Sequence, residues 1–473
     1  MSSEQPHGVV FPLTEGDRRS TTATGRAVLA AALRTVDPVG ALSVEQETAW
    51  RSGYLVHFRR AVEAGLGARE DALAVARDGL AALHERMRVR VDGDEVRLGD
   101  WSRTSPVTGD EVRGTGDPER ELTLPFHGER LRGDDVRRRV DAWVADGVAE
   151  PTLAEAVGAV LANPDWLRLE GRTVAVLGAG AEMGPLPALL RWGARAAALD
   201  LDRPAIWDRV LPMAREGAGT VVHAGVDLLA DVPAVADWLA EQPGSLVVGN
   251  YVYADGATNV RVAVAVDELS RRLLEARDDV ALAFLATPTD VFAVPGDAVA
   301  ESTRRYDGRS SRATWLGRPL RTVSGGRLLR RQYVPGTDPG VNDSLVPQQG
   351  PNYALAKRLQ RWRATVAREA GRTVSLNVAP PTRTRSVVKN RALAAAYAGA
   401  HRFGVEVFEP ATANVLMAAL LVHDLHTDGG PRHPQTWQDE AYAAVHGGLW
   451  RTPYAPRSAL GLAAVLGYGA ARG

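Results

Sequence analysis

The feature that most constrains the fold is an alternation of short apolar runs and helical periods that begins at Leu169. The runs are rich in Val, Ala and Leu, and the segments between them carry apolar residues at three- and four-residue spacing. This alternation is typical of a parallel sheet with crossover helices. Strands are predicted at 172–180, 195–201, 219–227, 245–253, 280–288 and 373–380. We therefore expect an α/β protein with a doubly wound, Rossmann-like parallel sheet.

The remainder of the chain divides around this region. Residues 1–22 are polar and broken by Pro and Gly, so we expect a flexible tail. Residues 23–168 are predicted to form a mostly helical domain, and 169–473 the nucleotide-binding domain with an insertion at about 290–351. Amphipathic periodicity predicts N-terminal helices at 24–36, 43–65, 69–87, 134–147 and 152–164.

Composition excludes several functional classes. The 473 residues include no cysteine, which rules out disulfides, thiolate metal ligands and a thiol nucleophile. The net charge of −1 gives no global attraction to nucleic acid or to an anionic membrane. The N-terminus lacks the pattern of a signal peptide and no segment has the apolar length of a membrane helix, so we expect a cytoplasmic protein. Only two of the 56 basic residues are lysines, Lys357 and Lys389.

A glycine-rich turn follows the first predicted strand. Gly178, Gly180 and Gly184 lie between that strand and the next helix, where missing side chains let backbone N–H groups approach a phosphate. Asp200 ends the second strand, where a carboxylate accepts hydrogen bonds from a ribose; Asp202 is a second candidate for this position. The alternative is a tight turn with a solvated acid. The same motif is compatible with S-adenosylmethionine-dependent methyltransferases, so it does not identify the nucleotide.

The second half of the sheet region carries a Tyr and a Lys on one helix face. Tyr353 and Lys357 are one turn apart in YALAK, at the start of the helix that follows the fifth strand. At this point the chain resembles the short-chain dehydrogenase/reductase superfamily. The resemblance implies that Tyr353 is the proton donor and acceptor, and that Lys357 lowers its pKa and binds the nicotinamide ribose. A surface Tyr and Lys on an amphipathic helix is the alternative.

Further residues match this superfamily in chain order, over roughly residues 170–425. The resemblance implies an adenine contact by the pair that closes strand three and a backbone turn after strand four that lines the cofactor. It also implies an Asn that holds a proton-relay water and a Pro-to-Thr segment near the carboxamide after strand six. The residues in these positions are Asp227, Leu228, Asn250, Asn259, Pro380 and Thr384.

Three departures from the superfamily pattern stand out. Glu182 replaces a glycine of the phosphate turn, and an acid there is unfavourable unless it points away. The catalytic Ser after strand five is absent; Thr287 or Thr289 supplies a hydroxyl at this place, and Ser344 is another candidate. The interval between strand five and Tyr353 is about 50 residues longer than usual, which defines the insertion.

The insertion is locally basic. From Arg304 to Arg331 it contains nine arginines against one acid, Asp307. We expect either a lid whose guanidinium groups bind a carboxylate or phosphate on a substrate, or a solvated loop or oligomer contact. Near the C-terminus, three histidines without a matching set of carboxylates predict a loop rather than a metal site: His423, His426 and His433.

The resemblance implies an NAD(P)-dependent oxidoreductase that transfers a hydride reversibly between nicotinamide and a carbonyl or alcohol carbon of a small molecule. Asp200 favours NAD over NADP because a carboxylate repels a 2′-phosphate, although Arg203 offers an alternative partner for that phosphate. No metal is needed, and a homo-oligomer is compatible with the sequence. The alternatives are an S-adenosylmethionine-dependent methyltransferase and a non-catalytic nucleotide-binding protein of the same fold.

Overall fold

A computed structural model describes residues 7–102, 105–308, 319 and 321–469 of the chain. Its centre is a seven-stranded sheet in the order β14-β11-β10-β7-β8-β9-β4, in which β4 alone is antiparallel. The strands are β4 (Asp110–Arg113), β7 (Arg172–Leu177), β8 (Arg195–Asp200), β9 (Thr220–Gly225), β10 (Ser245–Asn250), β11 (Val280–Ala286) and β14 (Val374–Val378). The six parallel strands are those predicted from the sequence, and the α/β, doubly wound class is confirmed.

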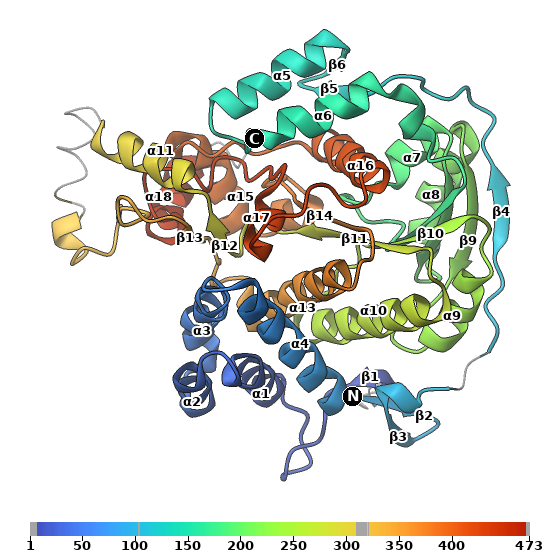
Figure 1. Cartoon of the computed structure of the whole chain (residues 1–473), viewed down its shortest axis with the longest axis horizontal. Helices are drawn as coiled ribbons and strands as arrows, with labels where there is room; N and C mark the ends of the chain where they lie inside the picture. The colour runs from blue at the N-terminus through green and yellow to red at the C-terminus, as the bar shows by residue number, and fades with distance from the viewer. Residues whose placement is uncertain (1–6, 103–104, 309–318, 320, 470–473) are drawn as a thin grey trace.

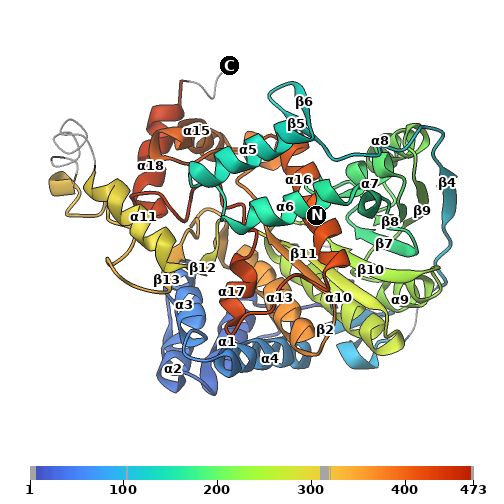
Figure 2. The ribbon, with the colours of Figure 1, turned by 45° about the horizontal axis from the view of Figure 1, so that its top comes forward.

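Helices cover both faces of the sheet (Figures 1 and 2). One face packs against α9 (Val232–Ala240), α10 (Gly256–Ala276) and α13 (Gly350–Glu369). The other packs against α7 (Leu186–Trp192), α8 (Pro204–Glu216) and α16 (Pro410–His426). Alternate strand residues point to opposite faces. Accordingly, Leu177 belongs to the first hydrophobic cluster and Val176 to the second.

The N-terminal helices share the first of these clusters. They are α1 (Thr21–Arg34), α2 (Pro38–Gln46), α3 (Trp50–Ala64) and α4 (Arg69–Arg86). In Figure 1, where these helices are blue, α1, α3 and α4 lie against α13, and α2 packs on α1 and α3. Gly79 of α4 meets the ring of Trp362, where a Cβ would come within 2.4 Å. Buried Asp267 of α10 joins the layers, because it pairs with His84 of α4 at 2.5 Å and with Arg363 of α13 at 2.7 Å.

Two sequence predictions differ from the observed N-terminal structure. The helix predicted over 43–65 is interrupted after Gln46, because the Glu47 carboxylate accepts the backbone N–H of Ala49 at 2.6 Å and a new helix begins at Trp50. Within the tail predicted over 1–22, Gly8–Val10 form a buried strand, β1. The backbone of Val9 is bonded to Leu229 and to Arg261, which fixes this segment against the sheet domain.

Smaller elements complete the chain. β1 pairs with β2 (Arg88–Val91), which pairs with β3 (Asp94–Arg97), and β5 (Thr123–Phe126) pairs with β6 (Glu129–Arg132). Two helices, α5 (Asp134–Ala145) and α6 (Thr152–Ala162), follow and α6 contacts α16. The short turns of 3₁₀ helix are Leu98–Asp100, Pro164–Arg168 and Ala400–Phe403.

The insertion and the C-terminal segments gather beyond the β14 edge of the sheet (Figure 1). The insertion contributes β12 (Val291–Val294), α11 (Gly296–Asp307) and β13 (Gly340–Asp343), of which the two strands pair with each other. The C-terminal helices here are α14 (Arg385–Lys389), α15 (Arg391–Gly399), α17 (Thr436–Ala441) and α18 (Pro456–Gly467). A third hydrophobic cluster, which includes Phe292 and Trp450, holds this part together.

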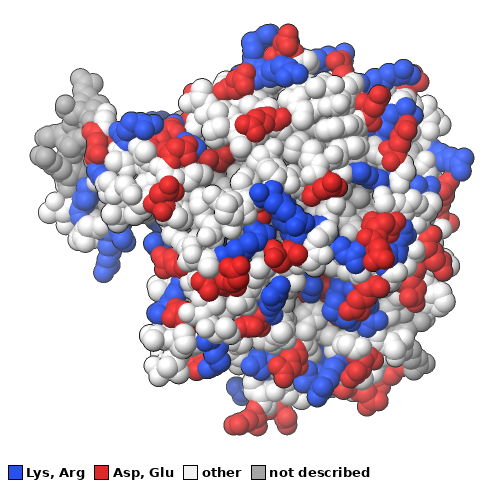
Figure 3. Space-filling view, viewed as in Figure 1, with Lys and Arg blue, Asp and Glu red and all other residues white. Residues whose placement is uncertain are grey.

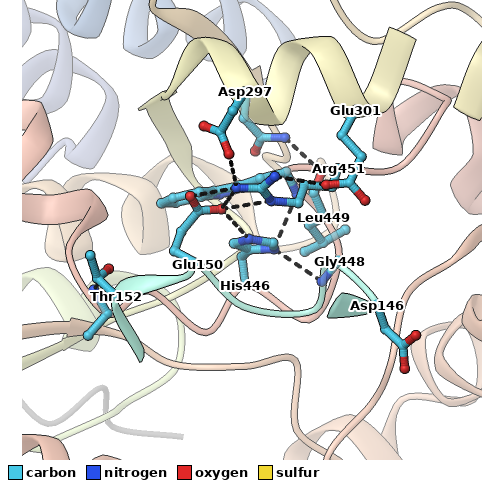
Figure 4. A network of polar contacts seen from close by, with 12 residues as sticks. Asp146, Glu150, Thr152, Asp297, Glu301, His446, Gly448, Leu449 and Arg451 are labelled. Atoms are coloured by element: carbon cyan, nitrogen blue, oxygen red, sulfur yellow. Dashed lines mark hydrogen bonds and ion pairs between the residues drawn. The ribbon is translucent and has the colours of Figure 1, made fainter. Parts of the chain in front are cut away.

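A buried polar network joins the insertion to the N-terminal half (Figure 4). Arg451 binds both carboxylate oxygens of Glu150 at 2.8 and 2.9 Å, and it also binds Asp297 and Glu301 of α11 at 2.8 Å. His446 Nδ1 accepts a backbone N–H from Gly448, so its Nε2–H donates to Glu150 at 3.0 Å. Burial lowers the pKa of His446, whereas His446 and Arg451 together hold that of Glu150 below its usual value.

The described residues contain no helix that is both long and apolar enough to cross a bilayer. On the face shown in Figure 3, acidic and basic side chains are interspersed. The loop predicted at the C-terminal histidines is wrong for His423 and His426, which lie in the last turn of α16. The three histidines bond separately: His423 to Asp424, His426 to the carbonyl of Val422 and His433 to Asp439. Within the described ranges no cluster of His, Asp and Glu is arranged to hold a metal ion.

Candidate active site

The parallel sheet brings the predicted site residues to one edge. In a parallel sheet all carboxyl ends lie together, and ligands bind there at the point where the strand order reverses. This point lies between β7 and β10, where Asn250 pairs in register with Leu177. The residues at or just after the strand ends are, in spatial order, Pro380, Thr287, Asn250, Gly178, Asp200 and Asp227.

The glycine turn after β7 is built around Gly178. This residue has φ +84°, which disfavours a side chain, and a Cβ would lie 3.2 Å from the backbone of Tyr251. Most backbone N–H groups from 178 to 184 bond within the protein, as those of Gly178 and Gly184 do. Across the described residues, the N–H groups of Glu182 and Met183 have no partner and are the ones left for a ligand.

Asp200 holds the glycine turn in place. Its Oδ2 accepts the N–H of Gly180 at 2.8 Å, and its Oδ1 accepts the N–H of Leu201 at 2.8 Å. Arg209 of α8 donates to the carbonyl of Gly180 at 2.6 Å, so a guanidinium lies beside the carboxylate. By contrast, Asp202 is exposed. The ribose contact expected of Asp200 stays a prediction, and its carboxylate also positions the glycine turn.

Glu182 points away from the turn to the segment after β14. Its Oε1 binds the Arg385 side chain at 2.8 Å and its Oε2 accepts the Arg385 backbone N–H at 2.9 Å. Thr384 precedes α14 and exchanges a hydrogen bond with Ser386 at 2.9 Å. The carboxylate that replaces a glycine in the superfamily pattern is therefore neutralised by a partner, and the bridge links the glycine turn to the Pro380–Thr384 segment.

The turns after β9 and β10 place three other predicted residues. Asp227 binds the backbone N–H of Leu229 at 2.9 Å and the His7 ring at 3.0 Å, so the N-terminal segment lies beside it, and Leu228 is buried. Asn259 in the first turn of α10 accepts the N–H of Ala254 at 3.2 Å.

Asn250, at the end of β10, differs from these residues in the hydrogen bonding of its side chain. It is 3% exposed, and its Oδ1 is buried without a hydrogen-bond partner in the described part of the chain. A buried polar atom without a partner is rare and calls for a ligand or water. It lies at the reversal point of the sheet.

The structure brings Tyr353 into contact with Thr287. Burial raises the pKa of Tyr353 to about 12, and the nearby Thr287 hydroxyl opposes part of this rise. The ring of Tyr253 meets the Tyr353 ring edge-on, with centroids 6.2 Å apart. Tyr353 is therefore protonated at neutral pH. We still predict that Lys357 and an oxidised nicotinamide lower the pKa of Tyr353 when the cofactor is bound.

Lys357 lies one turn further along α13. Its Nζ donates to the carbonyl of Leu285 at 3.3 Å and to Gln360 Oε1 at 3.2 Å. Burial lowers the pKa of Lys357 to about 8. The ammonium group thus lies at the end of β11, next to the loop that carries Thr287.

The two candidate threonines form a chain of hydroxyl groups. Thr287 and Thr289 are hydrogen-bonded at 2.9 Å, and Gln349 donates to Thr289 at 3.1 Å. Ser344, the other candidate, donates instead to Asn342 at 2.7 Å. Thr287 is consequently the candidate that the geometry brings to Tyr353.

Buried Asp290, which the sequence analysis missed, fixes this loop to α13. It binds Arg358 at 2.9 Å and Arg361 at 2.7 Å, and Arg361 also pairs with Glu440. The arginines hold the pKa of Asp290 below its usual value against the effect of burial. The sequence does contain an acid directly after ATPT, Asp290, and two arginines three residues apart in the later helix. Sequence alone, however, gives no reason to pair these residues.

An apolar cavity of about 90 Å³ adjoins this hydroxyl chain. Its polar lining includes Thr289, Ser344 and Tyr397. The remaining wall is mostly Leu, Ala, Val and Phe side chains of α15, α18 and the segments between them. The cavity offers space for an apolar group within reach of the Thr287–Tyr353 pair.

Comparisons with known proteins give low similarity. No family model and no curated protein matches the chain. The thiolation-reductase di-domain of an archaeal non-ribosomal peptide synthetase matches with a TM-score of 0.30 and 11% identity, over 53% of this chain and 52% of that one. The terminal R domain of the myxalamid PKS-NRPS pathway matches with a TM-score of 0.30 and 16% identity, over 53% and 61%. The chain thus spans about half to three fifths of these structures, and similarity this low carries no conclusion about activity.

Proposed function

We propose that this protein is an NAD(P)-dependent oxidoreductase that transfers a hydride between nicotinamide and a carbonyl or alcohol carbon. The observation that carries the proposal is the Tyr353 hydroxyl beside Thr287, one helical turn from Lys357, at the carboxyl edge of a doubly wound sheet. In this arrangement the phenol can donate a proton to a carbonyl oxygen, the second hydroxyl can polarise the carbonyl, and the ammonium group can stabilise the phenolate that forms.

The turn residues fit a dinucleotide. The N–H groups of Glu182 and Met183, which have no partner among the described residues, offer donors to phosphate oxygens. The buried Oδ1 of Asn250 offers an acceptor at the reversal point. Asp200 presents a carboxylate at the expected ribose position, so NAD(H) is the preferred form in this proposal. When bound, the nicotinamide supplies the hydride donor or acceptor.

The residues of the chain then have separate roles. Tyr353 donates its proton to the substrate oxygen, and its protonated state at neutral pH suits the reductive direction. Thr287 donates a second hydrogen bond to the same oxygen and polarises the carbonyl. Lys357 stabilises the phenolate that Tyr353 becomes after proton transfer, and Asp290 keeps the Thr287 loop fixed to α13.

Cofactor binding is the first test of this proposal. We expect NAD(H) to raise the melting temperature of the full chain, because a ligand at 100 times its Kd adds about 2.7 kcal/mol to the free energy of unfolding. Differential scanning fluorimetry with NAD(H), NADP(H) and S-adenosylmethionine measures this shift. Stabilisation by S-adenosylmethionine alone would overturn the proposal in favour of a methyltransferase.

Asp200→Asn is expected to weaken cofactor binding about tenfold or more. The two oxygens of Asp200 accept two N–H groups, whereas an amide has a single acceptor oxygen, so the N–H of Gly180 or Leu201 then faces an NH₂ group. Losing a hydrogen bond to a charged group costs about 1.5–3 kcal/mol. Isothermal titration with NADH measures the Kd, and Asp202→Asn is the matched control. An unchanged Kd in Asp200→Asn would remove Asp200 from the site.

A further inference from the structure

We propose that the substrate carries an oxyanion, a carboxylate or a phosphate, at the end of an apolar body, and that Arg327 and Arg330 bind this anion. The inference rests on the proposed function, because it takes the Thr289 end of the apolar cavity, next to Thr287 and Tyr353, as the place of reaction. It assigns a substrate class and a second binding subsite to the chain.

A second cavity, of about 190 Å³, lies beyond the apolar one. Five arginines line it together with a single acid, Asp343. The arginines come from three distant parts of the chain: Arg59 from α3, Arg327, Arg330 and Arg331 from the insertion, and Arg457 from α18. We call this space the arginine cavity. Arg309, Arg312 and Arg318 of the insertion lie outside the described residues.

Ion pairs neutralise three of the five guanidinium groups. Arg457 pairs with Asp343, Arg331 with Asp307, and Arg59 with Glu63. Among the described residues, Arg327 and Arg330 have no carboxylate partner. The arginine cavity therefore carries an excess of positive charge that a bound oxyanion would balance.

The backbone that carries Arg330 is held on both sides. The N–H of Leu329 bonds to the carbonyl of Ser458 at 3.1 Å, and the N–H of Arg330 bonds to the Ser458 hydroxyl at 3.0 Å. The carbonyl of Arg330 accepts the N–H of Ala455 at 2.8 Å. Helix α18 begins at Pro456 in the same wall, so its positive N-terminal end also faces this region.

The two cavities adjoin, because Pro456 and Arg457 line both of them. From the Thr289 hydroxyl the apolar cavity leads to Arg457, and from there the arginine cavity begins. A ligand with its reacting carbon at Thr287 and Tyr353 would thus have apolar atoms in the first cavity and an anionic end in the second. A neutral apolar compound fills only the first.

Binding of simple alkyl probes tests this inference without cofactor. Isothermal titration of the full chain at physiological salt compares octanoate, octyl phosphate, octanol, acetate and inorganic phosphate. We expect both octyl anions to bind at least tenfold more tightly than octanol, and octanoate more tightly than acetate. The tighter of the two octyl anions identifies the head group. Equal binding of octanol and both octyl anions overturns the proposal, and equal binding of acetate and octanoate overturns the apolar part.

Two double variants locate the site. Arg327→Gln/Arg330→Gln should weaken binding of the preferred octyl anion about tenfold or more, because both unpaired charges are removed. Arg113→Gln/Arg138→Gln makes the same change in net charge at exposed positions of β4 and α5 and should leave binding unchanged. Equal losses in both double variants, or none in the first, would refute the assignment. If the octyl anions do not bind as expected but the wild type binds NADH, only the oxyanion subsite is refuted and the proposed function stands. If the wild type does not bind NADH, the proposed function is refuted instead.

Discussion

Tyr353→Phe is expected to reduce turnover roughly 10²–10⁴-fold, the range that a positioned acid or base contributes. The substitution removes the proton donor and retains the ring against Tyr253. Thr287 keeps its hydrogen bond to Thr289, so the Thr287 hydroxyl still has a partner in the variant. The measurement is kcat on an identified carbonyl substrate with saturating NADH, beside the Kd of NADH, which should stay unchanged.

Tyr253→Phe is the matched control for this substitution. Its ring lies beside that of Tyr353, but its hydroxyl donates to Asp255 at 2.9 Å and its side chain is exposed. We expect near-normal kcat for this variant. Near-normal kcat for Tyr353→Phe would instead show that the proton comes from another group.

Glu150→Gln is expected to destabilise the protein by about 3–5 kcal/mol, the cost of removing one partner from a buried ion pair. In the variant, the amide NH₂ faces either Arg451 or the His446 N–H, both of which are donors. Asp297 and Glu301 still neutralise Arg451, so the protein should remain folded at room temperature. Urea titration followed by circular dichroism measures the free energy of unfolding.

The pH dependence of this difference follows from the direction of the pKa shift. The pKa of Glu150 is lower in the folded state than the ordinary value of about 4.3. The stabilisation by Glu150 is therefore present above about pH 4.3, and it is lost as pH falls through the lowered folded pKa. Glu170→Gln, at an exposed pair with Arg168, is the control and should change stability by less than about 0.5 kcal/mol. An equally small effect in Glu150→Gln would contradict the prediction.

The sheet was predictable because its signals are local. Each parallel strand is a short apolar run, and four of the six end at or just before Gly, Asp or Asn. The fixed handedness of crossover connections then places the strand ends at one edge. This reasoning predicts from the sequence alone that Gly178, Asp200 and Asn250 lie at the same edge of the sheet. It gave no reason to expect β4, because an antiparallel edge strand of four polar-rich residues has no period of its own.

The polar networks were not predictable in the same way. Asp290 and Arg358 are 68 residues apart, and Glu150 and Arg451 are 301 residues apart. A chain with 56 basic and 57 acidic residues offers many pairings, and the choice among them depends on packing. The His7 contact with Asp227 is of the same kind, since a polar N-terminal segment alone indicates a tail.

Because α4 packs on α13, the sheet domain depends on the N-terminal helices for part of its outer layer. A nucleotide-binding sheet is usually closed by its own crossover helices, whereas here residues before Arg86 supply an outer layer over α13, and α13 carries Tyr353 and Lys357. A shorter chain that began at β7 would expose Trp362 and leave Asp267 without His84. The N-terminal helices thus support α13 from outside the sheet domain, and a substitution that disturbs their inner surface is expected to shift the helix on which Tyr353 and Lys357 lie.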